Sequence, residues 1–367
     1  MKQEDIIVPG YEKIVKFTEP LSGLNAIIAV HNTTLGPGLG GTRIYPYPNF
    51  DHALTDVLRL SKGMTYKAGM ANVGLGGAKS VIIADPKTNK SPALLHAFGE
   101  AVNTFGGKYI CAEDVGSNIE DIHTILNTTK YACGAGYELG SGDPSIFTAW
   151  GIVRGMKSIF KHLENHTSLE DKTIAIQGLG NVGKHLVNLL FWEGAKLIVA
   201  DVNEKALSGC FHRYEAEVVS PEEILFVDCD ILSPCAMGGI LNKETIPKLR
   251  CQAIAGSANN QLLHPSDADQ LNNRGIFYAP DFVINAGGLI NVSRELSPEG
   301  YQACESRKMT QEIHQNLLEI FQIANKKKIS THLAATEMVD YRLEHCIGKR
   351  SVEPVFHFGP DTSRKVS

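Results

Sequence analysis

Two lysines and an aspartate stand out because each lies beside glycines or at the end of an apolar run. Lys79 follows the glycines of "VGLGGAKSVII", Lys67 lies twelve residues earlier in "KGMTYKAGM", and Asp114 ends "KYICAED". Two ammonium groups held close together in an apolar site disfavour each other's charge, and burial acts in the same direction. A lysine whose pKa is lowered to about 7 to 8 can act as a general acid and base. We therefore expect proton transfer here, with Lys79 as a general acid and base and Asp114 as its acidic counterpart.

Each of these residues also has another interpretation. A phosphate loop requires the pattern G-x-x-x-x-G-K-[ST], but Ala78 precedes Lys79, and the next residues have the pattern of a buried strand rather than a helix. Lys67, at the end of a predicted helix, would also serve as a C-terminal lysine that stabilises the helix dipole. An aspartate at the end of a strand is commonly a turn former. The sequence disfavours only the phosphate loop and leaves the other two alternatives open.

The segments that must position these residues alternate between strand and helix patterns. Strand-like runs are "KIVKFTE", "LNAIIAVHN", "SVIIAD" and "KYICAED". Helical patterns run from Asp51 to Lys67 and through "SPALLHAFGEAVNTFG", and Ser117 with Glu120 forms a capping box for a third helix. This alternation predicts an α/β fold for the first part of the chain.

A second alternating series follows the loop "GSGDPS" and a long helical segment. It contains "TIAIQGLGNVGKHLVNLLFWEGAKLIVAD", in which an apolar strand, the pattern G-x-G-x-x-G, a helix and a final aspartate occur in the order of a dinucleotide-binding motif. Such a loop places a pyrophosphate at the helix N-terminus, and an acidic residue binds the ribose hydroxyls and repels a 2′-phosphate. The motif therefore predicts a Rossmann-type domain that binds NAD, through Gly178, Gly180, Asn181, Val182, Gly183 and Asp201.

Small polar segments end the later strands of this second series. They are "SPCA" with Ala236, "GSANN" with Asn259, and "NAGG" with Asn285, which follows the expected strand "IFYAPDFVIN". Ligands bind at the carboxyl ends of the strands in such sheets. We therefore expect these residues to line the cofactor site, although each asparagine alone is also a common turn residue.

Composition limits the class of protein. A chain of 367 residues with 43% hydrophobic and 20% charged residues favours two globular domains. A net charge of -5 and a pI near 6.2 give no basic surface for nucleic acid or membrane. The start "MKQEDIIVPG" has no apolar signal region, and the eight cysteines have no metal-ligand spacing, so we expect a cytoplasmic protein with reduced thiols and no metal.

Six motifs of this chain occur in one order: "GPGLGGTRIYP", "KGMTYKAGMANVGLGGAKSVI", "AEDVGS", "SGDPSIFTAWGIVRGM", "QGLGNVG" and "APDFVINAGGLINV". In order and spacing they resemble the family of glutamate, leucine, phenylalanine and valine dehydrogenases, over nearly the whole chain. The resemblance is greatest to the members that act on leucine. It implies NAD-dependent oxidative deamination of an L-amino acid to a 2-keto acid and ammonia.

The family pattern also implies an organisation. Residues 1–140, joined by 331–367, would form the substrate-binding and oligomerisation domain, and residues 145–330 the NAD-binding domain, with the substrate in a cleft between them. The family is oligomeric and commonly octameric, so the resemblance implies a homo-oligomer.

The resemblance assigns roles to individual residues. Lys67 would bind the substrate carboxylate, Lys79 would activate water as the general base, and Asp114 would carry protons to and from the amino group. Gly40 and Gly41 would line the substrate. Asn259 would lie on the nicotinamide side, and Thr148 would bond the carboxamide.

Specificity follows from the positions that meet the substrate side chain. Family members that use glutamate carry a lysine where this chain has Leu39, and a serine where it has Val292. A distal carboxylate would be left unpaired there, which is unfavourable. With Ala112 and Leu289 as further walls, a branched aliphatic side chain fits best. Leu289 is larger than the valine expected for leucine-specific members, so the ranking of leucine, isoleucine and valine stays open, and phenylalanine is the alternative substrate.

Two other functions compete with this one. Another NAD-dependent dehydrogenase, for example of 2-hydroxy acids, would use a histidine and an arginine, and no histidine lies in a comparable glycine-walled motif. A catalytically silent NAD-binding regulatory module would have no reason to keep both lysines and the aspartate.

Overall fold

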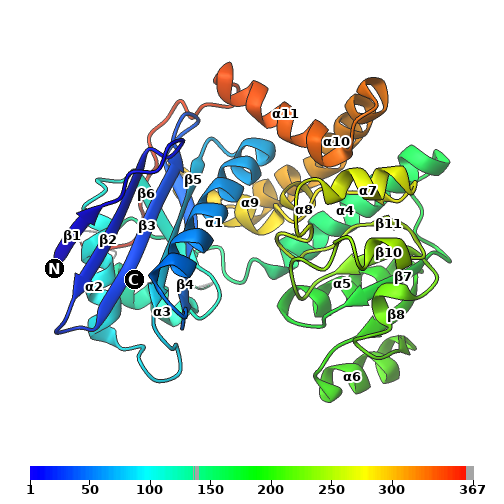
Figure 1. The fold of residues 1–367 in the computed structure, drawn as a ribbon, viewed down its shortest axis with the longest axis horizontal. Helices are drawn as coiled ribbons and strands as arrows, with labels where there is room; N and C mark the ends of the chain where they lie inside the picture. The colour runs from blue at the N-terminus through cyan, green and yellow to red at the C-terminus, as the bar shows by residue number, and fades with distance from the viewer. Residues whose placement is uncertain (135, 137–139, 361–367) are drawn as a thin grey trace. The chain divides into compact units, whose positions relative to one another are not determined.

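The computed structural model describes residues 1–134, 136 and 140–360, which form two compact units (Figure 1). The first unit comprises Met1–Asp143, Asn291–Ala303 and Tyr341–Ser367, and the second comprises Pro144–Ile290 and Cys304–Asp340. Neither unit is one continuous stretch of chain. The two-part α/β fold expected from the sequence is confirmed.

The first unit contains a mixed six-stranded sheet with three helices. Its elements are β1 (Lys2–Asp5), β2 (Lys13–Glu19), β3 (Leu24–Asn32), β4 (Gly38–Tyr45), α1 (Phe50–Ala71), β5 (Gly76–Ile83), α2 (Pro92–Asn103), β6 (Tyr109–Glu113) and α3 (Ile119–Leu126). The strand order is β1-β2-β3-β5-β4-β6. The first three pairings are antiparallel, whereas β4 is parallel to both β5 and β6.

Helices cover both faces of this sheet. One face packs its alternate apolar residues against α2 and α3, as Phe17 and Ile82 do against Phe98 and Ile122. The opposite face, which includes Val81, packs against α1 (Figure 1). Because side chains alternate along a strand, Lys79 lies on the same face as Val81 and therefore on the face that α1 covers in part.

Helix α1 is longer than the sequence pattern suggests. It begins after the N-cap Asn49, whose side chain accepts a hydrogen bond from the amide of His52. It ends at Ala71, and the C-cap Asn72 has the left-handed conformation, with φ of 52°. Lys67 therefore lies before the last turn, which holds no basic residue. The alternative of Lys67 as a helix-terminal lysine is wrong for this reason.

The predicted capping box before α3 is displaced by one residue. The N-cap is Asn118 and its partner is Asp121, not Ser117 with Glu120. The Ser117 hydroxyl instead donates to the Thr42 carbonyl at 2.8 Å and accepts from the Asp114 amide at 2.9 Å. Ser117 is thus occupied in holding the end of β6.

The second unit is a parallel sheet flanked by helices. Its strands are β7 (Thr173–Gln177), β8 (Lys196–Ala200), β9 (Glu217–Val218), β10 (Cys229–Pro234), β11 (Cys251–Ile254) and β12 (Phe277–Tyr278). Its helices are α4 (Ser145–Glu164), α5 (Asn181–Trp192), α6 (Glu204–Tyr214), α7 (Asp267–Asn273), α8 (Asp281–Ile284), α9 (Gly287–Ser293), α10 (Ala303–Lys327) and α11 (Thr331–Glu344), of which α9, α10 and α11 continue into segments of the first unit.

The strand order β12-β11-β10-β7-β8-β9, with parallel pairings throughout, is that of a Rossmann fold. The predicted strand through "IFYAPDFVIN" is too long: β12 ends at Tyr278, and α8 follows Pro280. A proline cannot donate to a strand ladder and suits the start of a helix, which explains the change. Among the helices described, none has the length and apolar character needed to span a bilayer.

Candidate active site

Three neighbouring strands of the first unit bring Lys79 and Asp114 together. Lys79 lies in β5 and Asp114 directly follows β6, while β4 runs between these strands. Gly41 of β4 pairs with Ala112 of β6. A β-carbon at Gly41 would lie 2.8 Å from the β-carbon of Asp114 and 3.1 Å from Lys79 Nζ. The two functional side chains thus converge over a position that has room for hydrogen only.

Lys79 and Asp114 form a largely buried ion pair. Lys79 Nζ lies 2.7 Å from Asp114 Oδ2, and the two side chains are 8% and 17% exposed. The sequence argument expected both the ammonium of Lys67 and the carboxylate of Asp114 near Lys79, and the carboxylate of Asp114 is in direct contact with it. Lys67 is half-buried in α1, which packs against β5. The base and the acid of the proposed chemistry are therefore in contact with each other.

The carboxylate of Asp114 is held as an anion. Burial opposes its charge, but the Lys79 ammonium and the Arg43 guanidinium together outweigh burial, so the pKa of Asp114 lies below its ordinary value. The backbone amide of Val115 also donates to this carboxylate. Asp114 is therefore ionised over the neutral pH range, as an acceptor of protons must be.

The structure adds Arg43 to the site, a residue that the sequence argument did not identify. Arg43 Nε lies 3.2 Å from Asp114 Oδ2, and its Nη1 lies 2.8 Å from Asp56 Oδ2 of α1. The Tyr47 hydroxyl donates to the same Asp56 oxygen at 2.5 Å. A usable signal was present, because in "GLGGTRIY" Gly41 and Arg43 are two residues apart and so share one face of the strand.

A buried polar cluster supports the strands from the opposite face. The Tyr109 hydroxyl lies 3.0 Å from the Gly40 carbonyl oxygen and 2.8 Å from Ser80 Oγ, which in turn donates to Thr42 Oγ1 at 3.1 Å. A β-carbon at Gly40 would overlap the Ala78 carbonyl. Glycine at this position lets β4 approach β5 closely enough for the functional face to form.

The residues expected to surround the substrate side chain differ in placement. Leu39 is buried on the face of β4 that carries Gly41, and Ala112 is half-buried opposite Gly41. Val292 is also buried and belongs to the first unit. Leu289 is buried within the second unit. The structure thus brings Gly41 and its strand partner Ala112 beside the ion pair, and Leu39 lies on the same face of β4.

The glycine motif of the second unit forms the turn from β7 into α5. Gly178 has φ of +99°, and a β-carbon there would lie 2.8 Å from that of Ala236. A β-carbon at Gly183 would overlap the Gly178 carbonyl oxygen, so glycine lets α5 pack on the turn. The N-cap is the exposed Gly180, with no side-chain cap, followed by Asn181 and Val182 in the first turn. This open helix N-terminus fits a pyrophosphate.

Asp201, directly after β8, is hydrogen-bonded to the same turn. Its Oδ2 accepts from the Leu179 amide at 2.5 Å, and its Oδ1 accepts from the Asn203 amide at 2.7 Å. These bonds fix a half-exposed carboxylate beside the glycine turn. A ribose hydroxyl can donate to such an oxygen, whereas a phosphate would be repelled.

Two asparagines meet beyond the ends of β11 and β12. The Asn285 amide donates to Asn259 Oδ1 at 2.9 Å and to the Ser257 carbonyl at 3.1 Å. Within the described part of the chain, Asn285 Oδ1 is a buried oxygen with no hydrogen-bond partner. An unsatisfied buried acceptor is unfavourable, and a donor such as an amide or a hydroxyl of a bound cofactor would satisfy it. This observation also fits a dinucleotide.

Thr148 lies near the start of α4 and packs against α9. Its hydroxyl donates to the Pro144 carbonyl at 3.2 Å, and a β-carbon at Gly288 would lie 2.8 Å from Thr148 Oγ1. The "NAGG" glycines therefore allow α9 to approach the first turn of α4.

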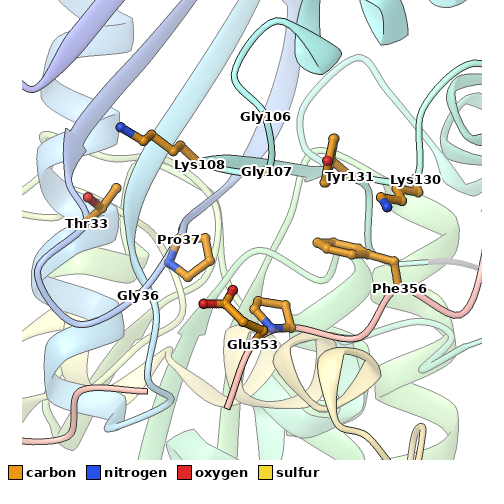
Figure 2. A pocket seen from close by; sticks show the side chains of 11 residues that line it. Thr33, Gly36, Pro37, Gly106, Gly107, Lys108, Lys130, Tyr131, Glu353 and Phe356 are labelled. Atoms are coloured by element: carbon orange, nitrogen blue, oxygen red, sulfur yellow. The ribbon is translucent and has the colours of Figure 1, made fainter. Parts of the chain in front are cut away.

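A cavity of about 450 Å³ in the first unit lies elsewhere. Figure 2 shows Tyr131 and Phe356 on one side of it and Thr33 and Lys108 on the other. Its lining residues Pro37 and Lys108 directly precede β4 and β6, whereas Asp114 follows the other end of β6. The cavity is therefore separate from the ion pair.

Together these features define a class of protein. The second unit is a Rossmann fold whose open glycine turn suits a dinucleotide, and the first unit holds a buried lysine–aspartate pair, which is the kind of group that can exchange protons. This combination is that of an oxidoreductase that acts on a small molecule.

Comparisons with known proteins give matches that cover most of the chain. Residues 12–131 match the family described as Glu/Leu/Phe/Val dehydrogenase, dimerisation domain, and residues 140–206 and 197–339 match Glutamate/Leucine/Phenylalanine/Valine dehydrogenase. Leucine dehydrogenase of Geobacillus stearothermophilus is 47% identical over 335 residues, 91% of each chain. Phenylalanine dehydrogenase of Lysinibacillus sphaericus is 45% identical over 351 residues, 93% of this chain and 91% of that one.

A solved structure agrees with these matches. L-tryptophan dehydrogenase from Nostoc punctiforme superposes with a TM-score of 0.79 at 41% identity, over 92% of this chain and 97% of that one. The chain belongs to the Glu/Leu/Phe/Val dehydrogenase family and is an amino-acid dehydrogenase. The alternatives of a 2-hydroxy-acid dehydrogenase and of a silent NAD-binding module are thereby set aside.

Proposed function

We propose that this enzyme oxidises a branched-chain L-amino acid, with leucine as the best substrate, to the 2-keto acid and ammonia, with NAD as the oxidant. The observation that carries the proposal is the buried contact between Lys79 and Asp114 beside Gly41. This contact supports the roles of base and acid for the two residues, because both lie on a strand face beside glycine. The similarity to leucine dehydrogenase supports the substrate class.

The chain's own residues would divide the work as follows. Lys67 binds the substrate carboxylate, Asp114 exchanges a proton with the amino group, and Lys79 activates a water molecule. The direct Lys79–Asp114 contact supports transfer of a proton between these two groups. The low pKa of Asp114 supports its role as the group that is anionic at the start of the reaction.

The steps balance as an oxidation followed by a hydrolysis. NAD, when bound, accepts the hydride from the substrate α-carbon, while Asp114 takes a proton from the amino group, and an iminium results. Lys79 removes a proton from water as the oxygen attacks the iminium carbon. Asp114 then returns its proton to the nitrogen of the carbinolamine and, as ammonia leaves, takes the proton of the hydroxyl group, so that the 2-keto acid remains. The protons left on Lys79 and Asp114 pass to the solvent and to the released ammonia.

Residues of the second unit would hold the cofactor. The first turn of α5, which includes Asn181 and Val182, receives the pyrophosphate, and Asp201 receives the adenosine ribose. The fixed carboxylate of Asp201 supports NAD over NADP, since a 2′-phosphate would meet an anion. Ala236, Asn259, Asn285 and Thr148 complete the cofactor site in this proposal, and the unsatisfied oxygen of Asn285 supports their involvement.

The preference for an aliphatic side chain rests on Leu39 and its neighbours. Leu39 and Val292 are buried apolar residues, and a distal substrate carboxylate would find no cation among them. Ala112 and Leu289 are proposed as further walls. The 45% identity to a phenylalanine dehydrogenase supports phenylalanine as the second candidate.

The proposed division of labour assigns substrate binding and oligomer contacts to residues 1–140 with 331–367, and NAD binding to 145–330. A homo-oligomer, an octamer by family resemblance, is part of the proposal. The cytoplasmic location expected from the sequence stays a prediction.

A panel of L-amino acids tests the substrate. The enzyme is mixed with NAD and with leucine, isoleucine, valine, phenylalanine or glutamate at alkaline pH, and reduced nicotinamide is followed by absorbance. We expect reduction with the three branched substrates, slower reduction with phenylalanine, and none with glutamate. A methylene of difference in such a pocket changes kcat/KM by about 10- to 200-fold.

The control is Lys79→Ala, which removes the base and should abolish turnover while NAD binding stays near normal. Failure of leucine, isoleucine and valine to reduce NAD would remove the substrate proposal. Full activity of Lys79→Ala would remove the assignment of the base.

A further inference from the structure

A row of alternating charges extends from the candidate active site into the first unit. Lys79 contacts Asp114 at 2.7 Å, Asp114 contacts Arg43 at 3.2 Å, and Arg43 contacts Asp56 at 2.8 Å. The Tyr47 hydroxyl closes the row on Asp56 at 2.5 Å. Five side chains are thus linked: they come from β5, β4 and α1, from the residue after β6, and from the loop between β4 and α1.

Arg43 makes its two contacts with different nitrogens. Nε faces Asp114 and Nη1 faces Asp56, so the planar guanidinium is fixed at both ends. Its side chain is only 20% exposed. Burial opposes its charge, but Asp114 and Asp56 raise the pKa of Arg43 above its ordinary value. The group is a rigid and permanent cation.

The proposed reaction requires such a cation. Lys79 must lose its proton before it can remove one from water, and its positive charge beside Asp114 is lost at that moment. A guanidinium does not lose its proton in proteins. With Lys79 neutral, Arg43 is the cation that still contacts Asp114 Oδ2.

We infer that Arg43 is a positioning residue: it fixes the Asp114 carboxylate beside Lys79 and keeps it an anion while Lys79 exchanges its proton. This inference rests on the proposed function and extends it to a residue with no direct role in the chemistry. Asp56 and Tyr47 in turn fix Arg43.

Several titratable groups surround Asp114 and enter any pH dependence. The groups that interact electrostatically with Asp114 itself are Lys79, Arg43, Glu113 and Tyr109. Asp56 and Tyr47 interact with Arg43 and so lie one contact further away. Burial raises the pKa of both tyrosines, so they stay neutral. Arg43 and Lys79 are the cations of this group, and the removal of either leaves Asp114 with an excess of neighbouring negative charge.

The test compares Arg43→Gln with Arg43→Lys and with a matched control. Arg59→Gln removes the same charge from an exposed position of α1 in the same unit. For each variant, kcat, KM and the pH profile of kcat/KM are measured with leucine and NAD. A misplaced catalytic group typically costs about 100-fold in rate, so kcat of Arg43→Gln should fall about 10- to 100-fold with little change in KM.

The pH profile separates positioning from simple stability. Loss of a cation raises the pH at which neighbouring acids lose their protons, so the acidic limb of Arg43→Gln should move to higher pH. Arg43→Lys keeps the positive charge but lacks the two nitrogens that contact Asp114 and Asp56 at the same time. The acidic limb of its pH profile should therefore stay near the wild-type position, while its kcat remains low. Arg59→Gln should match the wild type. An Arg43→Gln profile that superimposes on the wild type would overturn the inference.

Asp56→Asn provides a second variant should Arg43→Gln not fold. The asparagine oxygen can still accept the Tyr47 hydroxyl, but the negative charge beside Arg43 is gone. The acidic limb should then move to lower pH, opposite to the Arg43→Gln shift. A shift to higher pH would contradict the inference.

An arm without catalysis separates this inference from the proposed function. With ¹³C-carboxyl-labelled aspartate, the Asp114 resonance is identified by its loss in Asp114→Asn and titrated without substrate or NAD. It should titrate at higher pH in Arg43→Gln than in the wild type. If the protein is inactive with every amino acid but the titration of Asp114 still shifts, the proposed function is rejected and the effect of Arg43 on Asp114 is supported. An unchanged titration in an active enzyme would reject the inference alone.

Discussion

At the residue scale, space is as decisive at this site as charge. Lys79 and Asp114 can approach because position 41 carries no side chain, and Gly41 itself has no special backbone conformation. Glycine is required here by its neighbours rather than by its φ. The motif is therefore not a flexible loop: its glycine leaves space on a strand for the two neighbouring side chains.

Gly41→Ala tests this point. The new methyl group would lie 2.5 Å from the Glu113 carbonyl oxygen and 2.8 Å from the Asp114 β-carbon, so β6 or the ion pair must shift. We expect kcat to fall about 100-fold, the usual order for misplaced catalytic groups, while the affinity for NAD is unchanged. Steady-state kinetics and NAD titration measure the two effects.

Gly63→Ala is the matched control, since a β-carbon at Gly63 of α1 meets no atom within 4 Å. It should keep full activity and stabilise the protein by roughly 1 kcal/mol through helix propensity. Equal activity of the two variants would show that Gly41 has no steric role.

The ion pair itself could be predicted only in part from single residues. Lys79 and Asp114 were identified because each belongs to a local motif. Arg43 was missed because its partners lie 13 and 71 residues away, and only the pairing of β4 with its neighbours and the packing of α1 make them adjacent. The same long-range geometry brings the carboxylate of Asp114 into direct contact with Lys79.

At the element scale, the sequence predicted which segments form strands and helices better than where they end. The N-cap of α3 moved to Asn118 because the Ser117 hydroxyl is already bonded to β4 and Asp114. Both residue types cap helices well, so tertiary contacts made the choice. The end of β12 was likewise set by Pro280 and the short helix α8, which an apolar run alone does not reveal.

The β7–α5 turn offers a prediction about cofactor choice. Asp201→Asn keeps an oxygen to accept the Leu179 amide but removes the charge that would repel a 2′-phosphate. A charge contact near a protein surface is worth about 1 to 4 kcal/mol, so the NAD-to-NADP ratio of kcat/KM should fall at least about fivefold. Kinetics with both cofactors measure the ratio.

Asp228→Asn serves as the control, because Asp228 is an exposed aspartate of the same unit. The NAD-to-NADP ratio of kcat/KM in Asp228→Asn should equal that of the wild type. An unchanged ratio in Asp201→Asn would remove the ribose argument and leave NAD preference without an explanation in this turn.

At the scale of the whole molecule, each unit has a complete sheet and its own apolar core, yet the chain crosses from one unit to the other repeatedly. The first crossing lies in the "GSGDPS" loop, which composition alone could suggest. The segment Asn291–Ala303 returns to the first unit, where the buried Glu295 accepts hydrogen bonds from the amides of Gly134 and Ser141. No local pattern in the sequence predicts such an exchange of segments.

The proposed assignment of the two ligands to separate units leads to a last prediction. NAD alone should slow amide hydrogen exchange in peptides of the second unit that contain the 178–183 turn, because a bound ligand stabilises the folded state to which it binds. Peptides of the first unit that contain β4 and the 109–114 segment should be protected when a branched-chain substrate or 2-keto acid is added as well. Mass spectrometry of the exchanged peptides measures both. The peptides of α2 serve as the reference, since its residues pack into the core on the far face of the sheet from Lys79. Protection of the 109–114 segment by NAD, with none at the 178–183 turn, would reverse the assignment.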